Sequence, residues 1–320
     1  MKLLKLVPDN TNIDFMRVRN IALALSMLVT IASLVIVGLR GLNLGVDFVG
    51  GQMIRATFAQ PIEVEQLRDR VDGLQLGESS IQESGGPQTF QIRLPRPEGG
   101  EAAANAAASR VRALIEQQYP GSRIDAVETV SGRVSEELAS DGLLAISLAM
   151  LGIAIYIWFR FEWQFGVGAL ATLFHDVSLI LGFFAITRLQ VDLNIVAAFL
   201  AVIGYSLNDT VVIYDRIREN LRKYRKMQIV PLLNLSLNET LSRTIVTSGS
   251  IMLALAMLLI FGPDVIFGLT IAILLGTFIG TYSSIYISAP ILVWLGVKPD
   301  SFLRIDEKVP TLEGGDGAVV

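Results

Sequence analysis

The chain has 320 residues, of which 52% are apolar and 18% are charged, and its net charge is −4. Soluble domains usually have about a quarter of their residues charged, so this composition excludes a disordered chain and argues against an ordinary cytosolic enzyme. The chain has no cysteine and one histidine, which excludes disulfides and cysteine-ligated metal sites. Its weakly acidic balance provides no broad positive field for nucleic acid.

Charged residues are concentrated in one block. Residues 40–140 hold 24 charged side chains, whereas residues 141–214 hold seven and residues 241–297 hold two. Two nearly charge-free blocks beside one polar block indicate an α-helical membrane protein with one folded domain outside the membrane.

Six apolar stretches are long enough to span a bilayer. A spanning helix needs about 20 apolar residues, because each residue adds about 1.5 Å across a core of about 30 Å. The first stretch exceeds a signal-peptide core and has no cleavage site after it, so we interpret it as a retained anchor. We expect Pro290 to end or kink the last one. The predicted spans are 21–39, 141–159, 164–187, 193–214, 238–261 and 265–294.

The polar block, residues 40–140, predicts a small α+β domain. Alternating or short apolar runs indicate strands at 52–59, 79–84, 88–94 and 124–130, and helical periodicity indicates helices at 63–75 and 101–119. The order βαββαβ is typical of a ferredoxin-like sandwich. The block has no histidine and its carboxylates are scattered. We therefore interpret it as a binding or lever module.

Basic residues indicate the orientation. Three segments that six spans place on one side carry all six lysines: residues 1–20, a loop at 215–237 and a tail at 295–320. Because short cytoplasmic loops are enriched in Lys and Arg, we expect both termini to be cytoplasmic and residues 40–140 to lie outside the cytoplasm.

Ionisable residues inside the spans are costly and mark function by default. Asp209 is predicted five residues before the cytoplasmic end of the fourth span, among Ser206, Asn208 and Thr210. A carboxylate that conformational change moves between wet and dry settings carries a proton. The alternative is a carboxylate hydrated near the membrane interface.

Arg243, near the start of the fifth span, is expected at a depth similar to that of Asp209. A nearby guanidinium favours an ionised carboxylate, so separating the two would couple motion to protonation; the alternative is an arginine that snorkels to the interface. His175 and Asp176, in the third span, point about 100° apart and are interpreted either as a structural hydrogen-bonded pair or as an extension of the proton path. One histidine supplies too few ligands for a metal site.

Four segments together resemble the SecF family of bacterial protein-export membrane proteins. The resemblance covers residues 12–298 and leaves the tail without a motif. The matching segments are LGVDFVGG at residues 44–51, HDV at 175–177, YSLNDTVV with YDRIRE at 205–219, and LSRT with TSG at 241–249.

The resemblance implies a half-unit of the RND superfamily that pairs with SecD, associates with the SecYEG channel and uses proton motive force to help preproteins across the bacterial inner membrane. It places the family's proton-path aspartate on Asp209 and its arginine partner on Arg243. Protons would be the coupling ion, with no other cofactor. Ser206, Asn208, His175 and Asp176 are secondary candidates for the path.

The segment after the first span is a candidate link to the outer domain. Asp47 and Phe48 are expected at the outer membrane surface, where they would connect the domain to the first span. Gly50 and Gly51 would serve either as a hinge or as ordinary turn residues.

Three other functions compete with this interpretation. An RND-type lipid or small-molecule exporter generally carries two six-span halves in one chain, and this chain has one. An intramembrane aspartyl protease would use Tyr214 and Asp215 as half of its motif, but the required G-x-G-D partner is missing. A structural scaffold would not account for Asp209 and Arg243 at matched depth.

Overall fold

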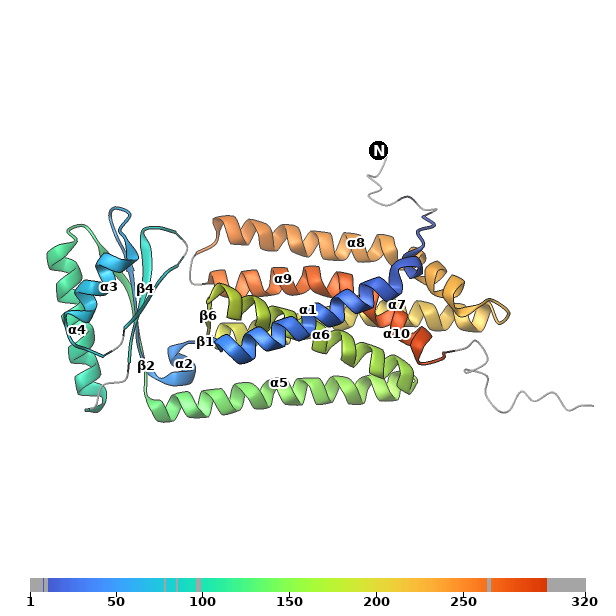
Figure 1. Ribbon diagram of the computed structural model, residues 1–320, viewed down its shortest axis with the longest axis horizontal. Coiled ribbons are helices and arrows are strands. Elements are labelled where there is room, and N and C mark those ends of the chain that lie inside the picture. Colours follow the sequence, from blue (N-terminus) through green and yellow to red (C-terminus); the bar gives the residue numbers. More distant parts are fainter. Residues whose placement is uncertain are drawn as a thin grey trace, which may run out of the picture.

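The structure is a computed structural model that describes residue 8 and residues 11–77, 79–84, 86–95, 99–263 and 266–297. In this described part, six helical segments are long and apolar enough to cross a membrane, as the sequence predicts. Figure 1 shows them running roughly along one long axis, with the α/β domain at one end. The segments are Phe15–Arg40, Gly132–Arg160, Trp163–Thr187, Leu193–Lys223, Ile229–Phe261 and Phe267–Trp294.

The spans have irregular ends. A 3₁₀ turn, η1 (Phe15–Val18), leads into α1 (Arg19–Arg40), and the next three spans are α5 (Gly132–Arg160), α6 (Trp163–Thr187) and α7 (Leu193–Lys223). The fifth span is α8 (Ile229–Phe261), and the sixth combines α9 (Phe267–Ser283), a π-helical turn η3 (Ser284–Ser288) and α10 (Ala289–Trp294). The wide turn precedes Pro290, which has no backbone N–H to donate to the preceding turn, so the span is distorted there without ending.

The expected loop at 215–237 is largely helical. Helix α7 continues to Lys223 and α8 begins at Ile229, which leaves residues 224–228 between them. Arg222 and Lys223 lie in the last turn of α7, where cations favour the negative end of the helix dipole, and Arg225 and Lys226 lie between the two helices. Pro231 is compatible with a helix because it lies in the first turn of α8.

The α/β domain, residues 51–130, is a four-stranded antiparallel sheet with two helices on one face, as its ferredoxin-like order predicts. The strand order is β3-β4-β2-β5, and α3 and α4 pack on a core that includes Ile54, Phe90 and Ile115. The domain ends at Val130, earlier than the expected residue 140, because α5 begins at Gly132. The elements are β2 (Gly51–Thr57), α3 (Val64–Asp72), β3 (Ser80–Glu83), β4 (Thr89–Leu94), α4 (Gly100–Gln118) and β5 (Arg123–Val130).

The domain is joined to the helices through polar contacts around Arg188. Strands β1 (Asn43–Leu44) and β6 (Gln190–Val191) pair in parallel just after α1 and α6. The carbonyl oxygen of Arg188 accepts hydrogen bonds of 2.9 Å from Asn43 and from Gln82 on β3. The Arg188 guanidinium donates at 3.0 Å to the carbonyls of Arg40 and Gly41, at the end of α1. One residue therefore connects two spans to the sheet.

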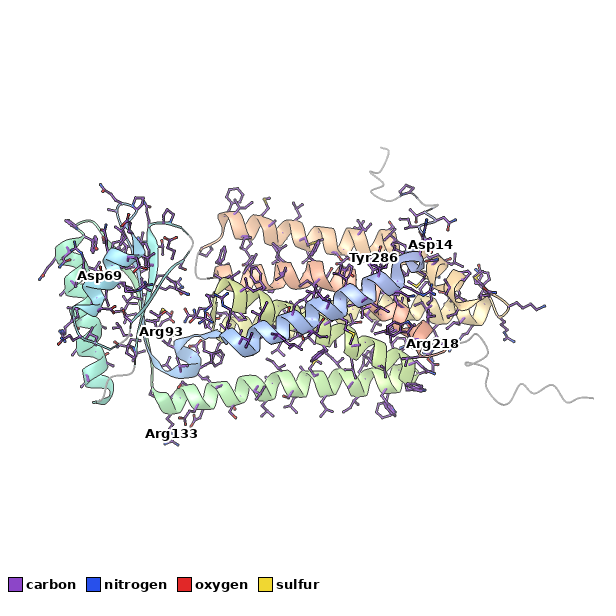
Figure 2. The ribbon with its side chains drawn as sticks, in the orientation of Figure 1. Asp14, Asp69, Arg93, Arg133, Arg218 and Tyr286 are labelled. Atoms are coloured by element: carbon purple, nitrogen blue, oxygen red, sulfur yellow. The ribbon has the colours of Figure 1, made fainter. Side chains whose placement is uncertain are left out.

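Arg93 makes a second contact at this boundary. It lies on β4, and Figure 2 shows it where the sheet meets the membrane helices. Its guanidinium donates to the carbonyl of Leu44. Burial, together with the positive charge of Arg188, lowers the pKa of Arg93. Side chains of β3 and β4 thus join the domain to the adjacent ends of the spans.

Two glycines bring α9 close to α7. A Cβ on Gly280 would lie 3.1 Å from the Cβ of Ser206, and one on Gly276 would lie 3.0 Å from the Cβ of Val202 and closer to its methyl groups. Gly276 and Gly280 are four residues apart, and small residues at this spacing let two helices approach closely. This contact places the helix that carries Asp209 against the sixth span.

We predict that Gly276→Ala destabilises the protein by about 1–3 kcal/mol, because the added methyl overpacks the contact with Val202. Gly204→Ala, at a position with open space around it on the same bundle, is the matched control. It should be neutral or stabilising by up to about 1 kcal/mol, since Ala favours helix over Gly. Thermal unfolding of the purified protein in detergent measures both, and equal shifts would contradict the proposed contact.

Candidate functional site

Asp209 lies near the middle of α7, not close to its end as the sequence suggested. The helix extends nine residues beyond the predicted end of the span at residue 214, which changes the position of Asp209 along the helix. Its side chain is 3% exposed, in a helix whose neighbours are mostly apolar. A buried carboxylate of this kind needs hydrogen-bond donors or a proton.

The carboxylate of Asp209 is linked to a row of hydroxyl groups. Ser248 on α8 donates to its Oδ2 at 3.2 Å. Tyr205 donates to Ser248 at 3.0 Å, and Thr281 on α9 donates to it at 2.9 Å. The row therefore connects three helices through one serine. Such a group of hydroxyls can pass a proton, because a hydroxyl is able both to donate and to accept a hydrogen bond, as Ser248 does here.

Asp176 on α6 belongs to a second hydrogen-bonded cluster, which shares no hydrogen bond with the Asp209 group among the residues that the structure describes. The Oδ2 of Asp176 accepts hydrogen bonds from Ser206 on α7 at 2.6 Å and from Ser283 on α9 at 2.9 Å. Its Oδ1 lies 2.9 Å from Nδ1 of His175. All three donors are buried, so the carboxylate is well satisfied. His175 and Asp176 are therefore within hydrogen-bond distance of each other, although adjacent residues on a helix point in different directions.

Arg243 does not form an ion pair with Asp209 in this structure. Among the described residues, no Asp or Glu oxygen lies within 4.0 Å of an Arg243 nitrogen, and the Arg243 side chain is exposed on α8. Its charge still acts electrostatically on Asp209. Arg243 precedes Ser248 by five residues, about 7–8 Å along the helix. Arg243 and the Ser248 that bonds Asp209 therefore lie on the same helix but at different heights along its axis.

The remaining predicted residues are Ser206 and Asn208 on α7 and the glycine pair that precedes β2. Ser206 belongs to the Asp176 cluster, whereas Asn208 is exposed on the opposite side of α7. Gly50 and Gly51 have φ of +72° and +113°, conformations that favour glycine. A Cβ on Gly50 would lie 3.3 Å from Gly132 of α5, so this glycine also permits a close contact. Whether the pair acts as a hinge stays a prediction.

Sequence reasoning missed Ser248, Thr281 and Ser283 as members of these clusters. A signal was present: α9 is an apolar helix in which hydroxyl residues recur on the face that carries Gly276 and Gly280. Helical spacing alone could have placed them toward α7, but it could not have named their partners on other helices.

Two family models match the chain. Residues 110–298 match the C-terminal region of the protein export membrane proteins SecD and SecF, and residues 35–62 match the SecD/SecF GG motif. The first match includes Asp176, Asp209 and Arg243, and the second includes Asp47, Gly50 and Gly51.

Curated relatives match over nearly their full length. A protein translocase subunit SecF from Cereibacter sphaeroides is 43% identical over 92% of this chain and 93% of its own. The protein of the same name from Pseudomonas aeruginosa is 40% identical, over 91% and 94%. The crystal structure of SecDF, a translocon-associated membrane protein from Thermus thermophilus, is similar with a TM-score of 0.83 at 30% identity. That match covers 91% of this chain but 39% of the SecDF chain.

We predict that Asp176→Ala destabilises the bundle more than Asp176→Asn. The alanine leaves the donors on His175 and Ser206 without an acceptor, at about 1–3 kcal/mol for each buried group, and leaves Ser283 with only its 3.2 Å hydrogen bond to the carbonyl of Gly280. The asparagine keeps one acceptor oxygen in place. Thermal unfolding in detergent measures the difference. If Asp176→Ala unfolds at the temperature of the parent protein, the cluster does not contribute to stability as described.

Proposed function

The chain belongs to the SecF family, whose members are accessory subunits of the Sec protein translocase, and we propose that it couples proton motive force to the completion of preprotein export together with SecD. In this proposal it sits in the bacterial inner membrane, associates with the SecYEG channel and acts on the translocating preprotein. The similarity to SecDF, of which this chain matches 39%, supports SecD as the partner that completes the unit.

The difference between the two buried aspartates carries the proton-coupling proposal. Asp176 has three hydrogen-bonding neighbours, whereas in the described part of the chain Ser248 is the one side chain that donates to Asp209. An ionised carboxylate has about four acceptor sites. Asp209 therefore gains more from taking up a proton than Asp176 does. The hydroxyl row through Ser248 supports the same role.

Arg243 is the proposed electrostatic partner of Asp209. It acts on the carboxylate through space without a direct ion pair, so motion of α8 along α7 would strengthen or weaken the interaction. A proton that moves down a potential of 100 mV releases about 2.3 kcal/mol. That energy changes a two-state equilibrium by roughly 50-fold, which is sufficient to shift helix positions.

A non-enzymatic role fits the arrangement of the carboxylates better than proteolysis does. An aspartyl protease needs two carboxylates that share a proton at about 3 Å. Asp215 follows Asp209 by six residues on α7, about 9 Å along the axis. Its carboxylate is instead 2.8 Å from Arg160, at the exposed end of the helix. This geometry supports assigning no catalytic residues to the chain.

We also propose that both termini are cytoplasmic and the α/β domain lies outside. Figure 1 shows the start of α1 and the end of α7 at the end of the bundle far from that domain. These segments carry Arg17, Arg19 and the basic residues of 216–226. Such a charge distribution supports the assignment, because positive residues stay on the cytoplasmic side.

Asp209→Asn is predicted to abolish the part of export that depends on the proton gradient while leaving assembly with SecD intact. The amide keeps the size of the side chain but cannot take up a proton. Export of a preprotein into inverted membrane vesicles, with and without a proton gradient, measures this. Asp215→Asn, on the same helix but at its exposed end, is the control and should export normally. Normal gradient-dependent export by Asp209→Asn would remove the proton-path proposal.

The orientation is testable by labelling, since the chain has no native cysteine. A cysteine at exposed Gln117 on α4 should react with a membrane-impermeant thiol reagent from outside intact spheroplasts. A cysteine at exposed Arg222 on α7 should react only after the membrane is opened. The reverse pattern would invert the proposed topology.

A further inference from the structure

Two carboxylates, not one, close the N-terminus of α7. Asp192 is the ordinary N-cap: its Oδ1 accepts a hydrogen bond from the backbone N–H of Ile195 at 3.1 Å. The N–H of Leu193, the first residue of the helix, donates instead to Oδ2 of Asp47 at 3.0 Å. That donor usually has no partner within its own helix. Asp47 lies 146 positions earlier in the chain and supplies it.

Asp47 is held in place by a short helix, α2 (Val46–Val49), that is packed between two spans. Gly45 precedes it and donates from its N–H to the carbonyl of Val191 at 2.7 Å. A Cβ on Gly45 would lie 3.2 Å from the carbonyl oxygen of Val191 and 3.3 Å from the Cβ of Asp192, so a side chain here would crowd the approach of α2 to the start of α7. The absence of a side chain at Gly45 thus permits the contact that Asp47 makes.

The other side of α2 contacts α5. Phe48 lies near Gly142 of α5 and packs with the apolar cluster that includes Ile195. Gly50, which ends α2, lies against Gly132 and Ser135. The chain then enters β2, one of the two central strands of the α/β domain. Helix α2 is therefore bonded to α7 on one side and packed on α5 on the other, directly before the domain begins.

We propose that Asp47 is a positioning residue for Asp209: its carboxylate fixes the start of α7 to α2 and so makes the outer domain move with the helix that carries the proton site. This inference rests on the proposed function, because it assigns to Asp47 the step between proton uptake and domain motion. It gives the acidic residue of the GG motif a defined contact, at the end of α7 that faces the domain.

The electrostatics of the site agree with this role. A negative charge is favourable at a helix N-terminus, and here two are held at the same end. Burial, opposed by the hydrogen bonds of the cap and assisted by the charge of Asp47, raises the pKa of Asp192. The repulsion between the two carboxylates is the cost of this arrangement.

The test compares three variants of the full chain, assembled with SecD and SecYEG. Asp47→Ala removes the acceptor, Asp47→Asn keeps an acceptor oxygen, and Asp141→Ala removes an exposed acid on the outer half of α5 as a charge control. Two quantities are measured: amide hydrogen exchange over the first turn of α7, and preprotein export with and without a proton gradient.

We expect Asp47→Ala to speed exchange at the first turn of α7 by about fivefold, the loss of one helix cap. We also expect it to reduce gradient-dependent export while gradient-independent export stays unchanged. Asp47→Asn and Asp141→Ala should match the parent in both measurements. If Asp47→Ala does not assemble, Asp47→Glu, whose carboxylate lies one methylene further out, replaces it with the same expected pattern.

Gradient-dependent export at the parent level in Asp47→Ala, or reduced export with unchanged exchange at α7, would overturn the positioning role. Failure of the underlying function is distinguishable, because it would appear as normal gradient-dependent export in Asp209→Asn. The exchange measurement reports the Asp47 contact in either case.

Discussion

A carboxylate that is surrounded by apolar helices must find its hydrogen bonds inside the protein, and this requirement organises the centre of the bundle. Asp176 draws Ser206 and Ser283 toward it and thereby fixes α6, α7 and α9 to one another. The glycines of α9 make this possible, because they let α9 approach α7 closely enough for serine hydroxyls to reach across. The bundle centre thus joins apolar packing to two small polar clusters.

Helix α7 runs from the α/β domain past Asp209 to the opposite end of the bundle (Figure 1). Its N-terminal end is capped by Asp192 and Asp47, its middle carries Asp209, and its C-terminal half carries the ion pair between Asp215 and Arg160. An α-helix transmits displacement along its axis, because its backbone hydrogen bonds hold the residue spacing constant. A change in charge at Asp209 is therefore expected to act on both ends, and the N-terminal end is the one joined to the sheet domain.

The sequence predicted the six spans and the βαββαβ domain because both depend on local patterns of polarity and length. It identified Asp209 for the same reason, since a charge in an apolar run is visible without a fold. It placed the end of α7 too early and the start of α8 too late, because basic residues suit the last turn of a helix as well as a loop, and a proline such as Pro231 is compatible with the first turn of a helix. It could not find the contact between Asp47 and Leu193, whose partners are 146 positions apart and are brought together by the β1–β6 pairing and by Gly45. Nor could it show that Asp176 accepts more hydrogen bonds than Asp209, because that contrast depends on serines of α7, α8 and α9 that the fold brings together.

The central claim is that Asp209 changes its protonation state in the working complex. Infrared difference spectroscopy of the complex assembled with SecD, recorded between neutral and acidic pH, measures this through the carbonyl stretch of a protonated carboxylic acid. The account predicts a carboxylic acid band that is lost in Asp209→Asn and retained in Asp215→Asn. A spectrum that is identical in the parent and in Asp209→Asn would contradict it.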